Sequence, residues 1–159
     1  MIIRVIGMTV ALLLLAACSS TPPAPEAGPA PHAMGPGYAP GSQQDLAATA
    51  GDRVFFAYDK SDISAEGQQI LQRQAQWLQR YPQVTVTIEG HCDERGTREY
   101  NLALGERRAD ATKNVLIALG IPAARIKTIS YGKERPIVVG SSEDSYAQNR
   151  VAITMVNGG

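Results

Sequence analysis

The polar segment His91–Arg98 and the predicted helix after it carry the residues best suited to hold a charged ligand. Asp93 offers a carboxylate in the segment, and Arg108 offers a guanidinium in the helix. A carboxylate binds an ammonium, and a planar guanidinium binds a carboxylate through two parallel hydrogen bonds. On either side of one pocket, the two charges would suit a ligand that carries both groups, as a free amino-acid centre does.

The pattern of the predicted helix selects Arg108 over its neighbour Arg107. On a helical wheel of residues 100–119, the polar arc comprises Glu106, Arg107, Asp110, Lys113 and Asn114, and the apolar arc comprises Leu104, Ala111, Val115, Leu116 and Leu119. Asn101 and Arg108 fall within the apolar arc. Because an unpaired buried charge is very costly, an inward-facing Arg108 must find a carboxylate or several acceptors.

Two interpretations of Asp93 and Arg108 stay open at the level of the residues. The first is a direct salt bridge that closes the polar segment onto the helix. This is the simpler arrangement, and it would carry no information about function. The second is a pocket in which a zwitterionic ligand separates the two charges.

The consecutive residues His91, Cys92, Asp93 and Glu94 could also suggest a metal site or a thiol hydrolase. Neighbours in sequence rarely converge on one atom, and the predicted folded region has no second His or Cys to complete a metal shell. We therefore predict no metal, no cofactor and no catalytic residue.

The elements that must position these residues follow from the apolar pattern. Aromatic, β-branched or alternating runs predict strands over residues 53–58, 84–89, 126–130 and 151–156. Helical spacing predicts helices over residues 65–80, with Ser64 as N-cap and Trp77 in the core, and over about 99–119, closed by Gly120. The order implies an α+β two-layer sandwich, in which helices pack on one face of a mixed sheet of about four strands.

The first 17 residues have the order of a secretory signal peptide, with Arg4, then an apolar run, then small residues before Cys18. The run is too short to span a bilayer, which needs about 20 apolar residues. Leu15-Ala16-Ala17-Cys18 resembles a bacterial lipobox, so we expect cleavage before Cys18 and acyl chains on this cysteine as a membrane anchor. Ser19, in place of an aspartate, favours the outer membrane by the same resemblance.

Residues 18–42 contain most of the ten prolines of the chain, interleaved with Ala and Gly. Such a segment has too little large apolar surface to fold, and we predict a flexible tether that leads to one folded domain over residues 43–159. The 15 Lys and Arg balance the 15 Asp and Glu, so nucleic acid is not a predicted partner. With Cys18 acylated, only Cys92 would remain, which excludes an intramolecular disulfide.

Two segments, Glu89–Thr97 and Glu99–Ala109, resemble the signature of the OmpA-like domain family. The resemblance extends from about Val54 to the final strand and includes Asp59–Ile63, Ser130–Gly132 and Asn149-Arg150. Two positions depart from the family pattern: Cys92 stands where Thr or Ala is frequent, and Val151 stands where a second arginine is frequent. Neither departure touches the proposed charge pair.

The resemblance implies binding of the meso-diaminopimelate residue of the peptidoglycan stem peptide, whose side-chain end carries a free ammonium and carboxylate. It assigns Asp93 and Arg108 to this ligand, places Asp59 and Arg95 at the rim of the pocket, and gives Asn101 a role in ordering the loop. It further implies a lipoprotein of the outer membrane that ties this membrane to the cell wall within the Tol-Pal system during cell division, with the periplasmic protein TolB as a partner. The alternatives are a scaffold that acts mainly through protein partners and, less favoured, a cell-wall hydrolase.

Overall fold

Two long helices begin where a side chain can accept hydrogen bonds from the free backbone N–H groups of the first turn. In the computed structural model, which describes residues 37–158, α2 (Ala65–Arg80) follows Ser64, whose hydroxyl accepts from the N–H of Gly67 at 3.1 Å. Helix α3 (Arg98–Ala118) follows Thr97, whose hydroxyl accepts from the N–H of Tyr100 at 3.2 Å. Both helices agree with the sequence prediction to within one residue at each end.

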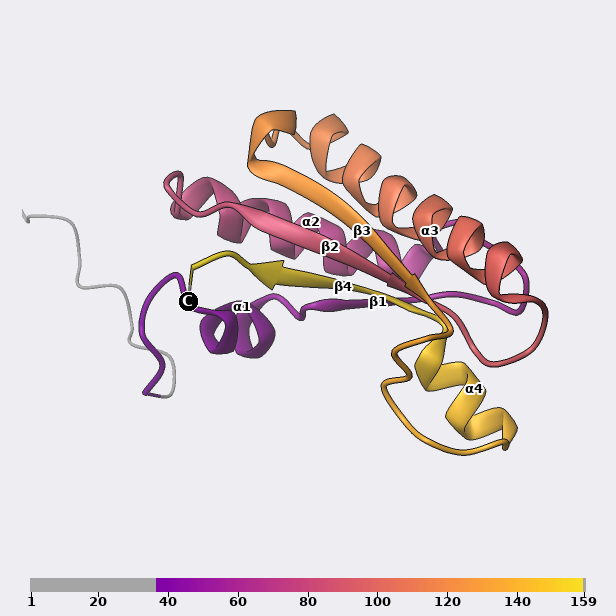
Figure 1. The fold of residues 1–159 in the computed structure, drawn as a ribbon. Coiled ribbons are helices and arrows are strands. Elements are labelled where there is room, and N and C mark those ends of the chain that lie inside the picture. Colours follow the sequence, from indigo (N-terminus) through magenta and orange to yellow (C-terminus); the bar gives the residue numbers. More distant parts are fainter. Residues whose placement is uncertain (1–36, 159) are drawn as a thin grey trace, which may run out of the picture. The chain divides into compact units, whose positions relative to one another are not determined.

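The strands form one mixed four-stranded sheet (Figure 1). They are β1 (Arg53–Phe55), β2 (Val86–His91), β3 (Ile126–Gly132) and β4 (Val151–Val156), in the order β1-β4-β2-β3. Strand β4 is antiparallel to both of its neighbours, whereas β2 and β3 are parallel and are joined through α3. The predicted α+β class with a mixed sheet is confirmed.

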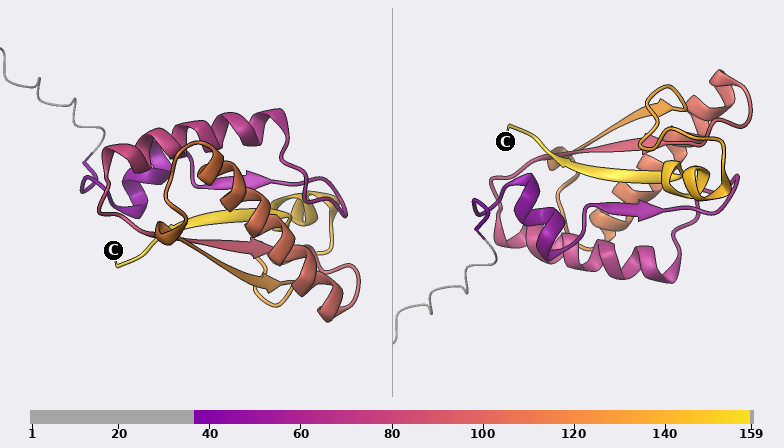
Figure 2. Two further views of the ribbon diagram at one scale, coloured as in Figure 1. Left: turned by 90° about the horizontal axis from the view of Figure 1, so that it is seen from above. Right: turned by 90° about the horizontal axis from the view of Figure 1, so that it is seen from below.

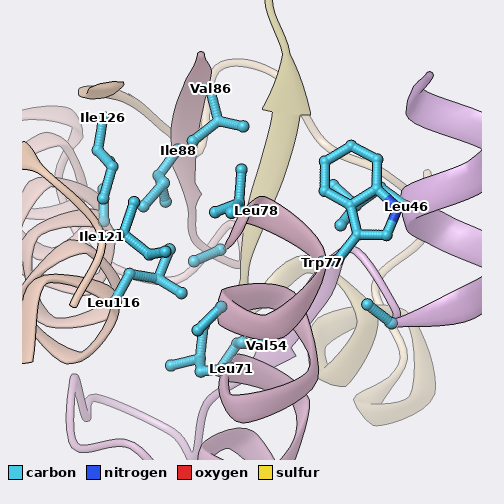
Figure 3. Close-up of a cluster of buried hydrophobic side chains, with 14 of the residues drawn as sticks. Leu46, Val54, Leu71, Trp77, Leu78, Val86, Ile88, Leu116, Ile121 and Ile126 are labelled. Carbon is cyan, nitrogen blue, oxygen red and sulfur yellow. The ribbon is translucent and has the colours of Figure 1, made fainter. Parts of the chain in front are cut away.

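Helices α2 and α3 cover the same face of the sheet (Figure 2). The register places Val54 of β1 beside Ala152 of β4, and both belong to the buried cluster that the helices close. Figure 3 shows the centre of this cluster, where side chains of the sheet, α2 and α3 meet, among them Val86, Ile88, Leu71, Leu78, Leu116 and Ile126. The opposite face is more open, and Phe55 and Ile129 are exposed there. The predicted packing of helices on one face is therefore confirmed.

Helix α3 approaches β2 without any side chain between the two backbones. A Cβ atom at Gly90 would lie 1.9 Å from the carbonyl oxygen of Gly105, and a Cβ atom at Gly105 would lie 2.9 Å from the carbonyl oxygen of Gly90. Only glycine leaves room for such contact. The pair fixes the first half of α3 directly on the end of β2, which sets the distance between the β2–α3 loop and the side chains of α3.

Two short helices and a 3-10 turn were not predicted from the sequence. Helix α1 (Gln43–Thr49) buries Leu46, and its Asp45 accepts a hydrogen bond from the indole N–H of Trp77 at 3.0 Å. The turn η1 (Ala123–Arg125) precedes β3, and α4 (Glu143–Asn149) leads into β4. Each of these elements is too short to show an apolar period, so the sequence pattern alone does not reveal it.

The first strand is shorter than the predicted range of residues 53–58. Strand β1 ends at Phe55. The carbonyl groups of Ala57 and Lys60 accept hydrogen bonds from the side chain of Arg108, and Asp59 has a φ of 55°. The chain therefore leaves the sheet because its carbonyl groups bind a side chain of α3 rather than a neighbouring strand. Strand β2 starts at Val86 rather than residue 84, and β3 continues to Gly132.

The predicted signal peptide, Cys18 and most of the predicted tether lie outside the described residues. Among residues 37–158, no helix is both long enough and apolar enough to cross a membrane.

Candidate functional site

All five ligand-site residues predicted in the folded region line one cavity of about 110 Å³. The lining comprises Tyr58, Asp59, Cys92, Asp93, Arg95, Gly96, Tyr100, Asn101, Leu104 and Arg108. Pockets for drug-sized ligands are several times larger, on the order of 300 Å³ or more. The size therefore suits the end of an extended ligand better than a whole small molecule.

Three parts of the chain meet at this cavity. The connection from β1 to α2 contributes Asp59, the loop after β2 contributes Asp93 and Arg95, and the first turns of α3 contribute Asn101 and Arg108. In Figure 1 these parts meet at the end of the sheet where α3 begins. The close packing of Gly90 on Gly105 holds the loop and the helix in place around the cavity.

Arg108 is fully buried, and its guanidinium is held by backbone carbonyl groups. Its Nε donates to Lys60 at 2.8 Å and its Nη1 donates to His91 at 2.9 Å, while Nη2 donates to Ala57 at 3.3 Å. Nη1 also lies 3.4 Å from the sulfur of Cys92, so the expectation that Cys92 does not touch the charge pair is wrong. A guanidinium has five N–H donors, so one N–H of Nη2 is left for a further acceptor.

Arg108 has no carboxylate partner in the part of the chain that the structure describes. None of the ion pairs formed by residues 37–158 includes Arg108, although it shares the cavity with Asp93. The interpretation of Asp93 and Arg108 as a direct salt bridge is therefore wrong. Burial lowers the pKa of Arg108, but arginine keeps its charge in proteins. The cavity thus contains a buried cation that would gain from an anionic ligand.

Asp93 is almost completely buried, with 4% of its surface exposed, and two other arginines bind its carboxylate. Arg95 approaches with both ends of its guanidinium, with Nη2 at 2.6 Å from Oδ2 and Nε at 3.1 Å from Oδ1. Arg150 places Nη1 at 3.4 Å from Oδ2. Burial would raise the pKa of Asp93, but the hydrogen bonds from Arg95 and Arg150 outweigh it, so the pKa lies below the ordinary value. Asp93 is therefore ionised in the cavity.

The lowered pKa of Asp93 predicts a pH-dependent contribution to stability. The ionised carboxylate should stabilise the fold above the pKa of an unfolded Asp, about 3.9, and this contribution should be lost as the pH falls through the lower pKa of the folded protein. In urea unfolding, the wild type should exceed Asp93→Asn in stability at pH 6, and the difference should shrink between about pH 5 and pH 3. A difference that stays constant over this range would contradict the assignment.

Asn101 and Cys92 hold the loop against α3. The amide of Asn101 donates to the carbonyl groups of Arg95 at 2.8 Å and Thr97 at 3.1 Å. The thiol of Cys92 donates to the carbonyl of Asn101 at 3.3 Å. Burial raises the pKa of Cys92 to about 11, so its sulfur stays protonated and is a poor nucleophile.

The rim of the cavity is aromatic. Tyr58 and Tyr100 are each about half exposed, and the hydroxyl of Tyr100 donates to Asp59. The guanidinium of Arg95 lies over the ring of Tyr58 at 4.1 Å and over the ring of Tyr146 at 4.4 Å. Asp59 lines the cavity, and its carboxylate faces the hydroxyl of Tyr100.

Several residues at the cavity were not among the predicted site residues. Tyr58 and Tyr100 belong to its lining, and Arg150, Glu143 and Tyr146 contact Asp93 or Arg95 from outside it. Arg150 is buried, and it binds Asp93, the carbonyl of Phe56 at 3.1 Å and Glu143 at 2.8 Å. Glu143 and Tyr146 belong to α4 and both contact Arg95. The motif Asn149-Arg150 was the available signal for Arg150. Glu143 and Tyr146 lie in a polar stretch whose helix was not predicted, so nothing in the sequence pointed to them.

No group of three or more His, Cys, Asp and Glu side chains within residues 37–158 could hold a metal ion. The site offers a buried guanidinium and an ionised carboxylate in one small cavity, an arrangement suited to binding a small group that carries both charges.

Residues 55–150 match the OmpA family, and the chain belongs to this family. Within it, the chain is similar to proteins named peptidoglycan-associated lipoprotein. The relative from Agrobacterium fabrum is 54% identical over 155 residues, which cover 97% of this chain and 87% of the relative. The relative from Brucella melitensis is 59% identical over 119 residues, which cover 75% of this chain and 71% of the relative.

The same similarity is found among solved structures. The crystal structure of the peptidoglycan-associated lipoprotein from Burkholderia pseudomallei superimposes with a TM-score of 0.65 at 42% sequence identity, covering 67% of this chain and 90% of that chain. Fold and sequence therefore agree on the family and on the part of the chain that carries its domain.

Proposed function

We propose that this chain binds peptidoglycan without a covalent bond, through the meso-diaminopimelate residue of the stem peptide. Arg108 binds the free carboxylate of that residue, and Asp93 binds its ammonium. Asp59 lies at the rim of the cavity, and Asn101 keeps the loop in the binding conformation. The names of the relatives support the choice of peptidoglycan as the ligand.

One observation carries this proposal. Three backbone carbonyl groups accept hydrogen bonds from the fully buried guanidinium of Arg108, but no carboxylate among the described residues compensates its charge directly. The ligand carboxylate supplies that compensation, while Asp93 lies in the same cavity for the ammonium. A ligand with only one of the two charges would leave half of the site unused.

The rest of the proposal concerns the place of the protein in the cell. Acyl chains on Cys18 anchor it in the outer membrane, and residues 18–42 let the domain reach the cell wall, which ties the two layers together. Through the Tol-Pal system, with TolB as a partner, this tie contributes to envelope integrity and cell division. The protein binds the wall and does not cleave it, so it should release no muropeptides from sacculi.

A sedimentation assay with purified sacculi tests the proposed ligand. The full-length protein should sediment with sacculi, and Asp93→Asn should lower its affinity about tenfold or more because the ligand ammonium loses its carboxylate partner. Glu94→Gln is the matched control, since Glu94 lies in the same loop but does not line the cavity. It should bind as the wild type does.

Two soluble tripeptides test whether the carboxylate of the diaminopimelate side chain is needed for binding. A muramyl tripeptide that ends in meso-diaminopimelate should compete with sacculi, whereas the same tripeptide with lysine keeps the side-chain ammonium, lacks the neighbouring carboxylate and should compete poorly. Circular dichroism must first show that each variant is folded. Equal binding by folded Asp93→Asn and Glu94→Gln would reject the proposed site.

A further inference from the structure

Asp93 and three other charged side chains form a closed ring of ion pairs. Arg95 binds Asp93 at 2.6 Å and Glu143 at 3.3 Å, and Arg150 binds Glu143 at 2.8 Å and Asp93 at 3.4 Å. We call these four residues the ion ring. The ion ring contains two positive and two negative charges, so the charge of Asp93 is already compensated when the ligand is absent.

The two arginines of the ion ring differ in their freedom to move. The side chain of Arg150 is only 10% exposed and is fixed by the carbonyl of Phe56. The side chain of Arg95 is 33% exposed, lines the cavity and faces solvent. An ammonium that enters the cavity can therefore reach Asp93 only by taking the place of Arg95.

Glu143 offers Arg95 a second partner that is already within reach. It lies 3.3 Å from Nη1 of Arg95, whereas Asp93 is bound by Nε and Nη2. The guanidinium of Arg95 also lies over the aromatic side chains of Tyr58 and Tyr146, which are not part of the ion ring. Arg95 can thus leave the oxygens of Asp93 and still keep a carboxylate and two aromatic contacts.

We propose that Arg95 is an internal substitute for the ligand ammonium, bound to both Asp93 and Glu143 while the cavity is empty and held by Glu143 alone when the ligand enters. This inference rests on the proposed function. It makes Arg95 a competitor of the ligand, and it makes Glu143 a positioning residue that never touches the ligand. No covalent bond is formed or broken. The ligand ammonium replaces Arg95 as a partner of Asp93, so Asp93 keeps the same number of ion pairs.

The exchange explains how the cavity can reject simple amines. An amine that displaces Arg95 gains one ion pair and breaks another, so it has little net advantage. A ligand with a neighbouring carboxylate gains the contact with Arg108 in addition. Competition from Arg95 therefore lowers the affinity for every cation, and only a zwitterion recovers the loss.

Calorimetry with the diaminopimelate muramyl tripeptide tests the exchange in the full-length protein. Arg95→Gln should bind the tripeptide about fivefold more tightly, because the competitor is absent. Glu143→Gln should bind about fivefold more weakly, because Arg95 loses the partner that receives it. The neighbour variant Asp144→Asn is the matched control and should bind as the wild type does.

The double variant Arg95→Gln/Glu143→Gln isolates the coupling between the two residues. Removing Glu143 should have a smaller effect once Arg95 is absent, because only its contact with Arg150 is then lost, so the double variant should bind nearly like Arg95→Gln. Weaker binding by Arg95→Gln than by the wild type would overturn the inference and make Arg95 a direct ligand contact. If the wild type does not bind the tripeptide, the proposed function is wrong. If the wild type binds it but Arg95→Gln binds it more weakly, only the exchange of Arg95 is wrong.

Discussion

Gly90→Ala should unfold the domain or lower its free energy of unfolding by about 3 kcal/mol or more. The new methyl group would lie 1.9 Å from the carbonyl oxygen of Gly105, a backbone atom that cannot move without shifting α3. Since α3 supplies Asn101 and Arg108, any shift that relieves the clash also deforms the cavity. Urea unfolding followed by circular dichroism measures the loss.

Gly51→Ala is the control for the general cost of replacing a glycine. Gly51 has a φ of 80°, so alanine there is strained, but the nearest side-chain atom would be an ordinary 3.7 Å away. We expect a loss of about 1 kcal/mol for this variant. Similar losses for Gly51→Ala and Gly90→Ala would mean that α3 can move away from β2 at little cost.

Arg108→Gln should abolish measurable binding to sacculi, with a loss of affinity of about 100-fold or more. It should also destabilise the domain by about 3 kcal/mol, because the carbonyl groups of Lys60 and His91 lose a charged donor in a buried place. Arg107→Gln, one residue earlier and on the exposed side of α3, should change neither property. Sedimentation with sacculi and urea unfolding measure the two effects separately.

Arg108→Lys separates the fold from the ligand contact. Lysine keeps the charge, but its three donors share one nitrogen and cannot reproduce the planar fork. Arg108→Lys should therefore lose less free energy of unfolding than Arg108→Gln and still bind sacculi weakly. Normal binding by a folded Arg108→Gln would exclude Arg108 as the carboxylate site.

The helical pattern was enough to place Asn101 and Arg108 on the inward face of α3, because both share a helical face with Leu104 and Leu116, which are buried. It could not reveal how Arg108 is held. Its partners are backbone carbonyl groups from the β1–α2 connection and from the end of β2, and a carbonyl group has no signature in the sequence. The salt bridge to Asp93 was the natural expectation for a buried arginine, and it was wrong for this reason.

The part of the site around Arg150 and Glu143 was harder to foresee. Helix α4 is short and polar, so neither its existence nor its position beside the cavity follows from an apolar period. Which of several arginines binds Asp93 depends on the local conformation of the loop, where Arg95 is only two residues from its partner. The core strands and long helices were predictable because their patterns repeat, and the contacts of single charged residues were not.

The chain enters the described domain at α1, whereas the cavity lies at the other end of the sheet, where α3 begins (Figures 1 and 2). A mechanical force applied between residue 37 and a ligand in the cavity would therefore run along the strands. Hydrogen bonds between antiparallel strands are perpendicular to the strands, so such a force loads many of them in shear at once rather than opening them one by one. A load in this direction would therefore act along the strands of the sheet rather than across them.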